Sequence, residues 1–157
     1  MNAYRLKPLR FPWPPLLYAA AVLSAIVLNR FVALPALHLH NVLAWGIGAI
    51  LVIAGVVLSV WAVKTLIECK TTFLPNRCAS HLVTRGPFRL SRNPIYLGYT
   101  LVTAGIGFLS GNSWFLVMAI VCVLAITFIA IRYEERHLLA RFGIEFERYC
   151  KQTRRWI

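Results

Sequence analysis

Polar and aromatic side chains gather in residues 81–98, directly before an apolar run and within its first turns. Arg92 and Asn93 precede Pro94 there, and Tyr96 follows it. A helix that begins at Pro94 has unpaired backbone N–H groups, and with Arg92 and Tyr96 it offers donors to an anionic or hydroxyl-rich group. An alternative needs no ligand, because Asn93 suits the N-cap and proline suits the first helical position. That alternative leaves Arg92 and Tyr96 unexplained.

The acidic residues are few, since the chain has five glutamates and no aspartate. Glu134 and Glu135 directly follow the last apolar run. One interpretation is a solvated helix face, on which the two carboxylates pair at helical spacing with Arg132, Arg136 or Arg141. The other is that one carboxylate turns inward and holds a cationic ligand at the mouth of a helix bundle. Both interpretations stay open at this point.

Metal and nucleophile motifs are scarce in this chain. The four cysteines form no C-x-x-C pair. A zinc site of Cys69, Cys78 and His81 is conceivable, but these spacings match no common ligand pattern. We therefore expect no metal site.

The composition is too apolar for a water-soluble domain of 157 residues, with 59% hydrophobic residues and a mean hydropathy of +0.68. Apolar residues form four runs, at roughly 16–34, 42–63, 94–109 and 114–131. Each run approaches the ~20 residues that cross ~30 Å of hydrocarbon, and the third is the shortest. The sequence therefore predicts an all-α fold, an integral membrane bundle of four transmembrane helices with a cytoplasmic loop and a C-terminal helix.

The connections and glycines indicate how these helices are arranged. Short links between runs one and two and between runs three and four predict two antiparallel hairpins. Gly105 and Gly107 in the third run favour close helix packing. Helical periodicity continues beyond Ile131 in charged residues, so the last span should extend into the cytoplasm, with Gly143 ending or bending it.

The net charge of +12 is placed on one side of the predicted membrane. Of the 17 Lys and Arg residues, all except Arg30 fall before the first run, between runs two and three, or after the fourth. The positive-inside rule therefore predicts that both termini and the middle loop are cytoplasmic. This placement argues against a nucleic-acid partner.

Two separated motifs together resemble the isoprenylcysteine carboxyl methyltransferase family, which is related to phospholipid methyltransferases. Residues 82–98 read L-V-T-x-G-P-F-x-x-x-R-N-P-x-Y-x-G, and residues 134–149 read E-E-x-x-L-x-x-x-F-G-x-x-F-x-x-Y. The resemblance covers about half of the chain. It implies one membrane domain, with a lead-in and first helical hairpin in residues 1–63 and a cofactor-binding methyltransferase core in residues 64–157.

The resemblance also implies S-adenosylmethionine as the cofactor, bound without a Rossmann domain. It assigns cofactor contacts to Ser80, His81, Leu82, Val83, Phe88, Asn93, Pro94, Ile95, Tyr96 and Glu134. We add Arg92, whose guanidinium can meet the carboxylate of the cofactor or an anionic substrate. Two positions depart from the family pattern: Asn93 replaces the usual histidine, and the substrate-contacting arginine falls on Ala130, with Arg132 nearby as the candidate substrate residue.

The sequence thus predicts a membrane enzyme that transfers a methyl group to a lipophilic acceptor, such as an isoprenylcysteine carboxylate. A phospholipid amine, a thiol or another lipophile is also open as the acceptor, and membrane lipids are expected partners. Two other classes compete: a nicotinamide-dependent membrane reductase, and a basic membrane module that binds anionic lipids. No residue is assigned a catalytic role.

Overall fold

The computed structural model describes residues 13–32, 34, 41–70 and 81–157, and all regular structure within these ranges is helical. The predicted N-terminal lead-in before Trp13 lies outside the described residues. The α-helices are α1 (Trp13–Phe31), α2 (Asn41–Glu68), α3 (Pro94–Ser110), α4 (Trp114–Ile126), α5 (Arg132–Phe142) and α6 (Ile144–Gln152). Two shorter elements also lie within these ranges, a 3-10 turn η2 (Gly86–Arg89) and a π-helical turn η3 (Thr127–Ile131).

Within the described part of the chain, three stretches of helix are long and apolar enough to cross a membrane: Pro14–Phe31, Val42–Glu68 and Trp114–Phe142. The fourth, Pro94–Ser110, is apolar but shorter. Large apolar side chains remain exposed along these helices, for example Ile50 and Ile53 on α2 and Ile120 on α4. In a membrane such side chains face lipid. The chain is therefore an integral membrane protein, and the predicted all-α membrane bundle is confirmed.

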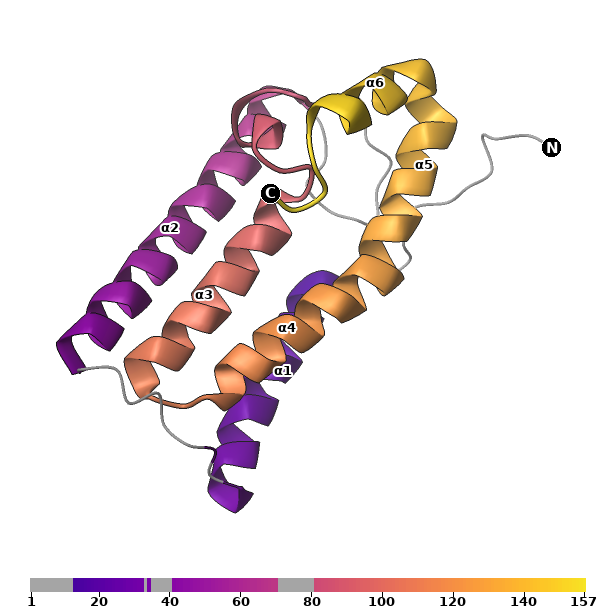
Figure 1. Cartoon of the computed structure of the whole chain (residues 1–157). Coiled ribbons are helices and arrows are strands. Elements are labelled where there is room, and N and C mark those ends of the chain that lie inside the picture. Colours follow the sequence, from indigo (N-terminus) through magenta and orange to yellow (C-terminus); the bar gives the residue numbers. More distant parts are fainter. Residues whose placement is uncertain (1–12, 33, 35–40, 71–80) are drawn as a thin grey trace.

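The order of the helices in space differs from the predicted pair of hairpins. α2 packs along α3, α3 contacts α4, and α1 lies against α4 on the far side from α2 (Figure 1). We expected α1 to pair with α2, and that prediction is wrong. Small and aromatic side chains of α1, namely Tyr18, Ala21 and Ala25, are buried on its side toward the bundle. The Asn112 amide also donates to the carbonyl of Ala25 at 3.1 Å, which ties α1 to the link between α3 and α4.

Glycines explain why α2 and α3 form the tightest pair. A Cβ atom added to Gly48 would lie 2.9 Å from the carbonyl oxygen of Gly105, and one added to Gly105 would lie 2.8 Å from that of Gly48. Gly55 and Gly98 face each other one heptad away, at 2.6 Å by the same measure in both directions. Small residues at a membrane helix interface allow this close approach. The predicted role of Gly105 in helix packing is confirmed.

The last span continues as helix well beyond its apolar part, as the sequence predicts. α4, η3 and α5 follow one another without interruption from Trp114 to Phe142. Gly143 then ends α5 with a φ of +51°, a conformation that favours glycine, and α6 begins directly after it. α6 turns back over the loop that contains η2 (Figure 1).

Replacing Gly48 with alanine should destabilise the bundle, because the added methyl group meets the backbone of α3. We expect a loss of roughly 1–3 kcal/mol, seen as a lower midpoint of thermal unfolding in detergent. Gly46 lies half a turn away, and a methyl group added there would meet no atom within 4 Å, so Gly46→Ala is the matched control and should leave the midpoint unchanged or raise it. Equal midpoints for the two variants would contradict the proposed α2–α3 contact.

Candidate active site at the start of α3

A tyrosine and a glutamate from two different helices meet at one end of the bundle. The hydroxyl of Tyr96, in the first turn of α3, donates to Oε1 of Glu134, in the first turn of α5, at 2.7 Å. Both side chains are partly buried. The structure therefore brings together two predicted cofactor residues that are 38 positions apart in the sequence.

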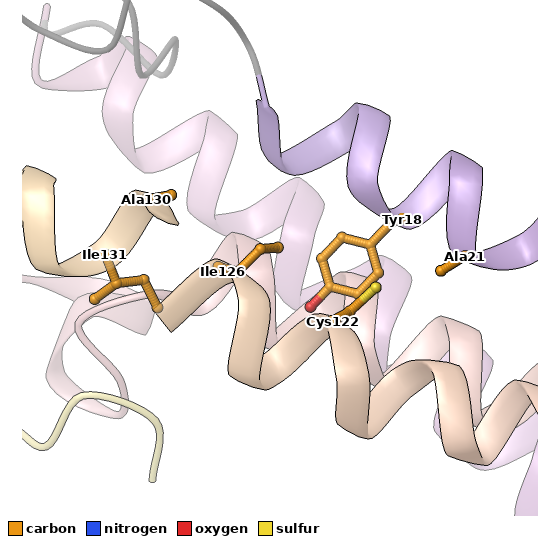
Figure 2. Close-up of a cluster of buried hydrophobic side chains, with 6 residues drawn as sticks. All are labelled: Tyr18, Ala21, Cys122, Ile126, Ala130 and Ile131. Atoms are coloured by element: carbon orange, nitrogen blue, oxygen red, sulfur yellow. The ribbon is translucent and has the colours of Figure 1, made fainter. Parts of the chain in front are cut away.

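The π-helical turn before α5 explains why Glu134 faces inward. Ile126, Ala130 and Ile131 are all fully buried, and the last two follow Ile126 by four and five residues. Figure 2 shows these side chains in one cluster with Tyr18, Ala21 and Cys122. The extra residue of a π turn rotates the helix that follows by about 100°. This rotation directs Glu134 toward α3.

Glu135, the next residue, has different partners. Its carboxylate accepts from Arg155 Nε at 3.0 Å and Arg155 Nη2 at 2.6 Å, and Arg92 Nη2 lies 2.9 Å from its Oε1. The hydrogen bond to Glu135 raises the pKa of Arg155. The partners of Glu134 and Glu135 therefore both lie outside α5. The interpretation of the two glutamates as a solvated face paired along the helix is wrong.

The C-terminal segment crosses the start of α3 and is held there by its backbone. The Arg92 N–H donates to the carbonyl of Arg154 at 3.0 Å, and Ser91 Oγ and Asn93 Nδ2 donate to the carbonyl of Arg155 at 3.2 and 3.0 Å. Asn93 occupies the N-cap position of α3, but its side chain makes no capping hydrogen bond. Its amide holds the tail instead.

Four of the predicted cofactor residues lie in a second apolar cluster. Val83 and Phe88 are buried with Phe146 and Tyr149 of α6, and Leu82 and Ile95 pack against them. The Tyr149 hydroxyl donates to the carbonyl of Phe88 at 2.6 Å, which fixes η2 against α6. Burial raises the pKa of Tyr149, so the phenol keeps the proton that it donates. These residues shape the loop beside Tyr96.

The remaining predicted residues take separate places. Pro94 is fully buried at the first position of α3, and His81 is exposed. Ser80 lies outside the described residues. Arg132 is exposed, and its guanidinium carbon lies 4.4 Å from the ring centroid of Phe128, so the structure does not bring it to Tyr96 and Glu134. Ala130, where the family has its arginine, faces the interior.

Sequence reasoning missed three contributors to this end of the bundle: Tyr18, Arg155 and Trp156. Tyr18 belongs to the buried cluster against which Tyr96 and Trp156 pack. Tyr18 is a tyrosine inside an apolar run, and this was the available signal. Arg155 was counted only as one of the basic residues after the fourth run, since no local pattern pairs it with Glu135.

The two carboxylates of the site differ in the charge of their partners. Arg92 and Arg155 both bind Glu135, whereas Glu134 is bonded to a neutral phenol. Arg92 Nε is buried and has no hydrogen-bond partner among the described residues. The site therefore presents a carboxylate for a cationic group and a guanidinium N–H for an anionic one. A zwitterionic ligand fits such a pair.

The fold and the geometry of the site define a class of protein: an all-α membrane bundle that carries a polar site at one end of its helices. Comparison with protein families places it further, because the phospholipid methyltransferase family matches residues 43–145. The chain belongs to this family and is a membrane methyltransferase, so the class of enzyme expected from the motifs is confirmed. Comparison with curated proteins and comparison with solved structures each gave no match.

Replacing Glu135 with glutamine should loosen the C-terminal segment, because both guanidinium groups lose their anionic partner. The side chains of Arg92 and Glu135 are only 13% and 18% exposed, so we expect a loss of roughly 1–3 kcal/mol in local stability. Hydrogen exchange of the Arg92 amide, which donates to the tail, measures this directly. Glu147→Gln on the exposed face of α6 is the control. Unchanged protection of the Arg92 amide in Glu135→Gln would show that the contacts of Glu135 with Arg92 and Arg155 do not hold the C-terminal segment.

Proposed function

We propose that the chain is an S-adenosylmethionine-dependent methyltransferase whose cofactor lies between the start of α3, the start of α5 and the loop at η2. The pair of Tyr96 and Glu134 is the observation that carries this proposal. A hydrogen bond from a neutral phenol, rather than from an arginine, leaves the Glu134 carboxylate able to take an external cation as its counter-ion. The family of the chain supplies the reaction class.

The residues present fit this cofactor group by group. Glu134 would hold its ammonium, and the unpartnered Nε of Arg92 would meet its carboxylate. Tyr96 and the backbone of residues 81–83 would orient its ribose and base, with Phe88 and Ile95 shaping the apolar wall behind them. When bound, the cofactor supplies a methyl group on a sulfonium as the electrophile.

The protein itself contributes alignment and exclusion of water. Displacement at a methyl group depends on the positions of donor and acceptor and on a site that keeps out competing water. Ile126, Ala130 and Ile131 line the membrane side of the Tyr96–Glu134 pair with fully buried apolar surface. We place the reacting end of the acceptor on this side.

The acceptor, on this proposal, is lipophilic and enters from the bilayer, and an isoprenylcysteine carboxylate is one candidate. Among the described residues, no soluble domain stands beside the bundle to form a separate substrate pocket. Arg132 lies outside the site over Phe128, where it can attract an anionic acceptor at the interface. We assign neither Glu134 nor Glu135 the role of a base, so on this proposal the acceptor is already nucleophilic at neutral pH.

The proposed orientation places both termini and the cofactor site in the cytoplasm. Basic residues at the end of α2, in η2 and in α5 and α6 lie at the same end of the bundle as the site (Figure 1). Arg30 lies in the last turn of α1, at the opposite end of the bundle from the site. The positive-inside rule supports this orientation.

Replacing Glu134 with glutamine should weaken binding of S-adenosylmethionine by roughly 1–3 kcal/mol, because a charge-assisted hydrogen bond in a partly desolvated site is lost. Titration calorimetry in detergent measures the change, with Glu145→Gln on the exposed part of α6 as the matched control.

Unchanged affinity in a folded Glu134→Gln variant would remove this residue from the cofactor site. A wild-type protein that binds anionic vesicles but not S-adenosylmethionine would favour the lipid-binding module instead. Binding of a nicotinamide cofactor in its place would favour the reductase.

A further inference from the structure

The first helix reaches the candidate site although it lies outside the residues that match the family. α1 ends at Phe31, and the family match begins at residue 43. Tyr18 of α1 is only 6% exposed and lies in the same buried cluster as Ile126 and Ala130 (Figure 2). Nothing in the family assignment requires this residue.

The hydroxyl of Tyr18 binds the first turns of α3. It lies 3.1 Å from the carbonyl oxygen of Tyr96 and 2.5 Å from Thr100 Oγ1. Thr100 Oγ1 itself donates to the carbonyl of Tyr96 at 2.9 Å. The ring of Tyr18 also meets Tyr99 edge to face, with centroids 5.5 Å apart. Tyr18 therefore contacts three residues within two turns of α3.

These contacts hold α3 on the side that faces away from α2. Gly98 faces α2, whereas Tyr99 and Thr100 face Tyr18. A phenol hydroxyl buried in an apolar cluster must keep its hydrogen bond, since an unpaired one is costly there. The position of Tyr18 thus fixes the backbone of Tyr96, whose side chain reaches Glu134.

We propose that Tyr18 is a positioning residue for the methyltransferase site: through the Tyr96 carbonyl and Thr100, it sets the distance between the Tyr96 hydroxyl and the carboxylate of Glu134. α1 is then a functional part of the site as well as a membrane span. This inference rests on the proposed function for its effect on the cofactor, but its structural step can be tested without any ligand.

Carboxyl carbon NMR can follow Glu134 directly, because five glutamates and no aspartate give a simple spectrum. Carboxyl-labelled protein in detergent is compared with Glu134→Gln, which identifies the resonance, and with Tyr96→Phe, which removes the hydrogen bond. Tyr18→Phe should shift the Glu134 resonance in the same direction as Tyr96→Phe and leave that of Glu135 in place. Thr100→Val, which alters the same cluster, is the second variant if Tyr18→Phe does not fold.

The matched control is Trp114→Phe, which removes the hydrogen bond from Trp114 Nε1 to the carbonyl of Val32 at 2.7 Å. Val32 directly follows the end of α1 that is remote from Tyr18. Trp114→Phe should leave the Glu134 resonance unchanged. An unshifted Glu134 resonance in both Tyr18→Phe and Thr100→Val, or equal shifts in Tyr18→Phe and Trp114→Phe, would overturn the inference.

Cofactor affinity gives the second measurement. Tyr18→Phe should raise the dissociation constant of S-adenosylmethionine by roughly 3- to 10-fold, and Trp114→Phe should not change it. A shifted resonance with unchanged affinity would overturn the functional part of the inference. If the wild-type protein binds no S-adenosylmethionine, the proposed function fails, and the carboxyl resonance still decides whether Tyr18 positions Tyr96.

Discussion

A polar group near the hydrocarbon layer must find a partner, and this requirement connects the elements of the bundle. An unpaired buried hydroxyl or carboxylate costs at least ~1–3 kcal/mol. The Tyr96 hydroxyl of α3 donates to the Glu134 carboxylate of α5, and the Tyr18 hydroxyl of α1 donates to the backbone carbonyl of Tyr96. Each bond joins two helices, so satisfying these groups also fixes where the helices lie. A site built on helix ends in this way is held more precisely than one carried by loops.

The neighbouring glutamates Glu134 and Glu135 have different partners and different roles. Two adjacent carboxylates repel each other, so each needs its own hydrogen-bond partners, and here these partners differ in charge. Glu135 binds two guanidinium groups and thereby joins the tail to the start of α3, whereas Glu134 binds a neutral phenol. Glu135 therefore has a structural role, whereas Glu134 is the carboxylate that the proposed function assigns to a ligand. The π turn makes this difference possible, because it directs Glu134 inward while Arg132 stays outside.

Much of this arrangement follows from the sequence, and the rest depends on contacts that no local pattern records. Apolar run lengths predict the helices, and Pro94 and Gly143 correctly mark a start and an end. The resemblance brings Tyr96 and Glu134 into one site, but no local pattern shows that they bond to each other. The pairing of α1 with α4 was not predicted, because short links favour contact between helices that are neighbours in the chain. Instead, α2 packs against α3, where the glycines of the two helices match. The π turn and the partner of Arg155 lack any sequence signal that we recognise.

On the proposed function, Tyr96 and Glu134 act as one unit in holding the cofactor. A double-mutant cycle with Tyr96→Phe, Glu134→Gln and the combined variant, measured as S-adenosylmethionine affinity by calorimetry, tests this claim most directly. Residues that share a hydrogen bond are expected to show a coupling of roughly 0.5–3 kcal/mol, so the double variant should lose clearly less or more affinity than the sum of the single variants. Losses that add to within about 0.3 kcal/mol would contradict the account.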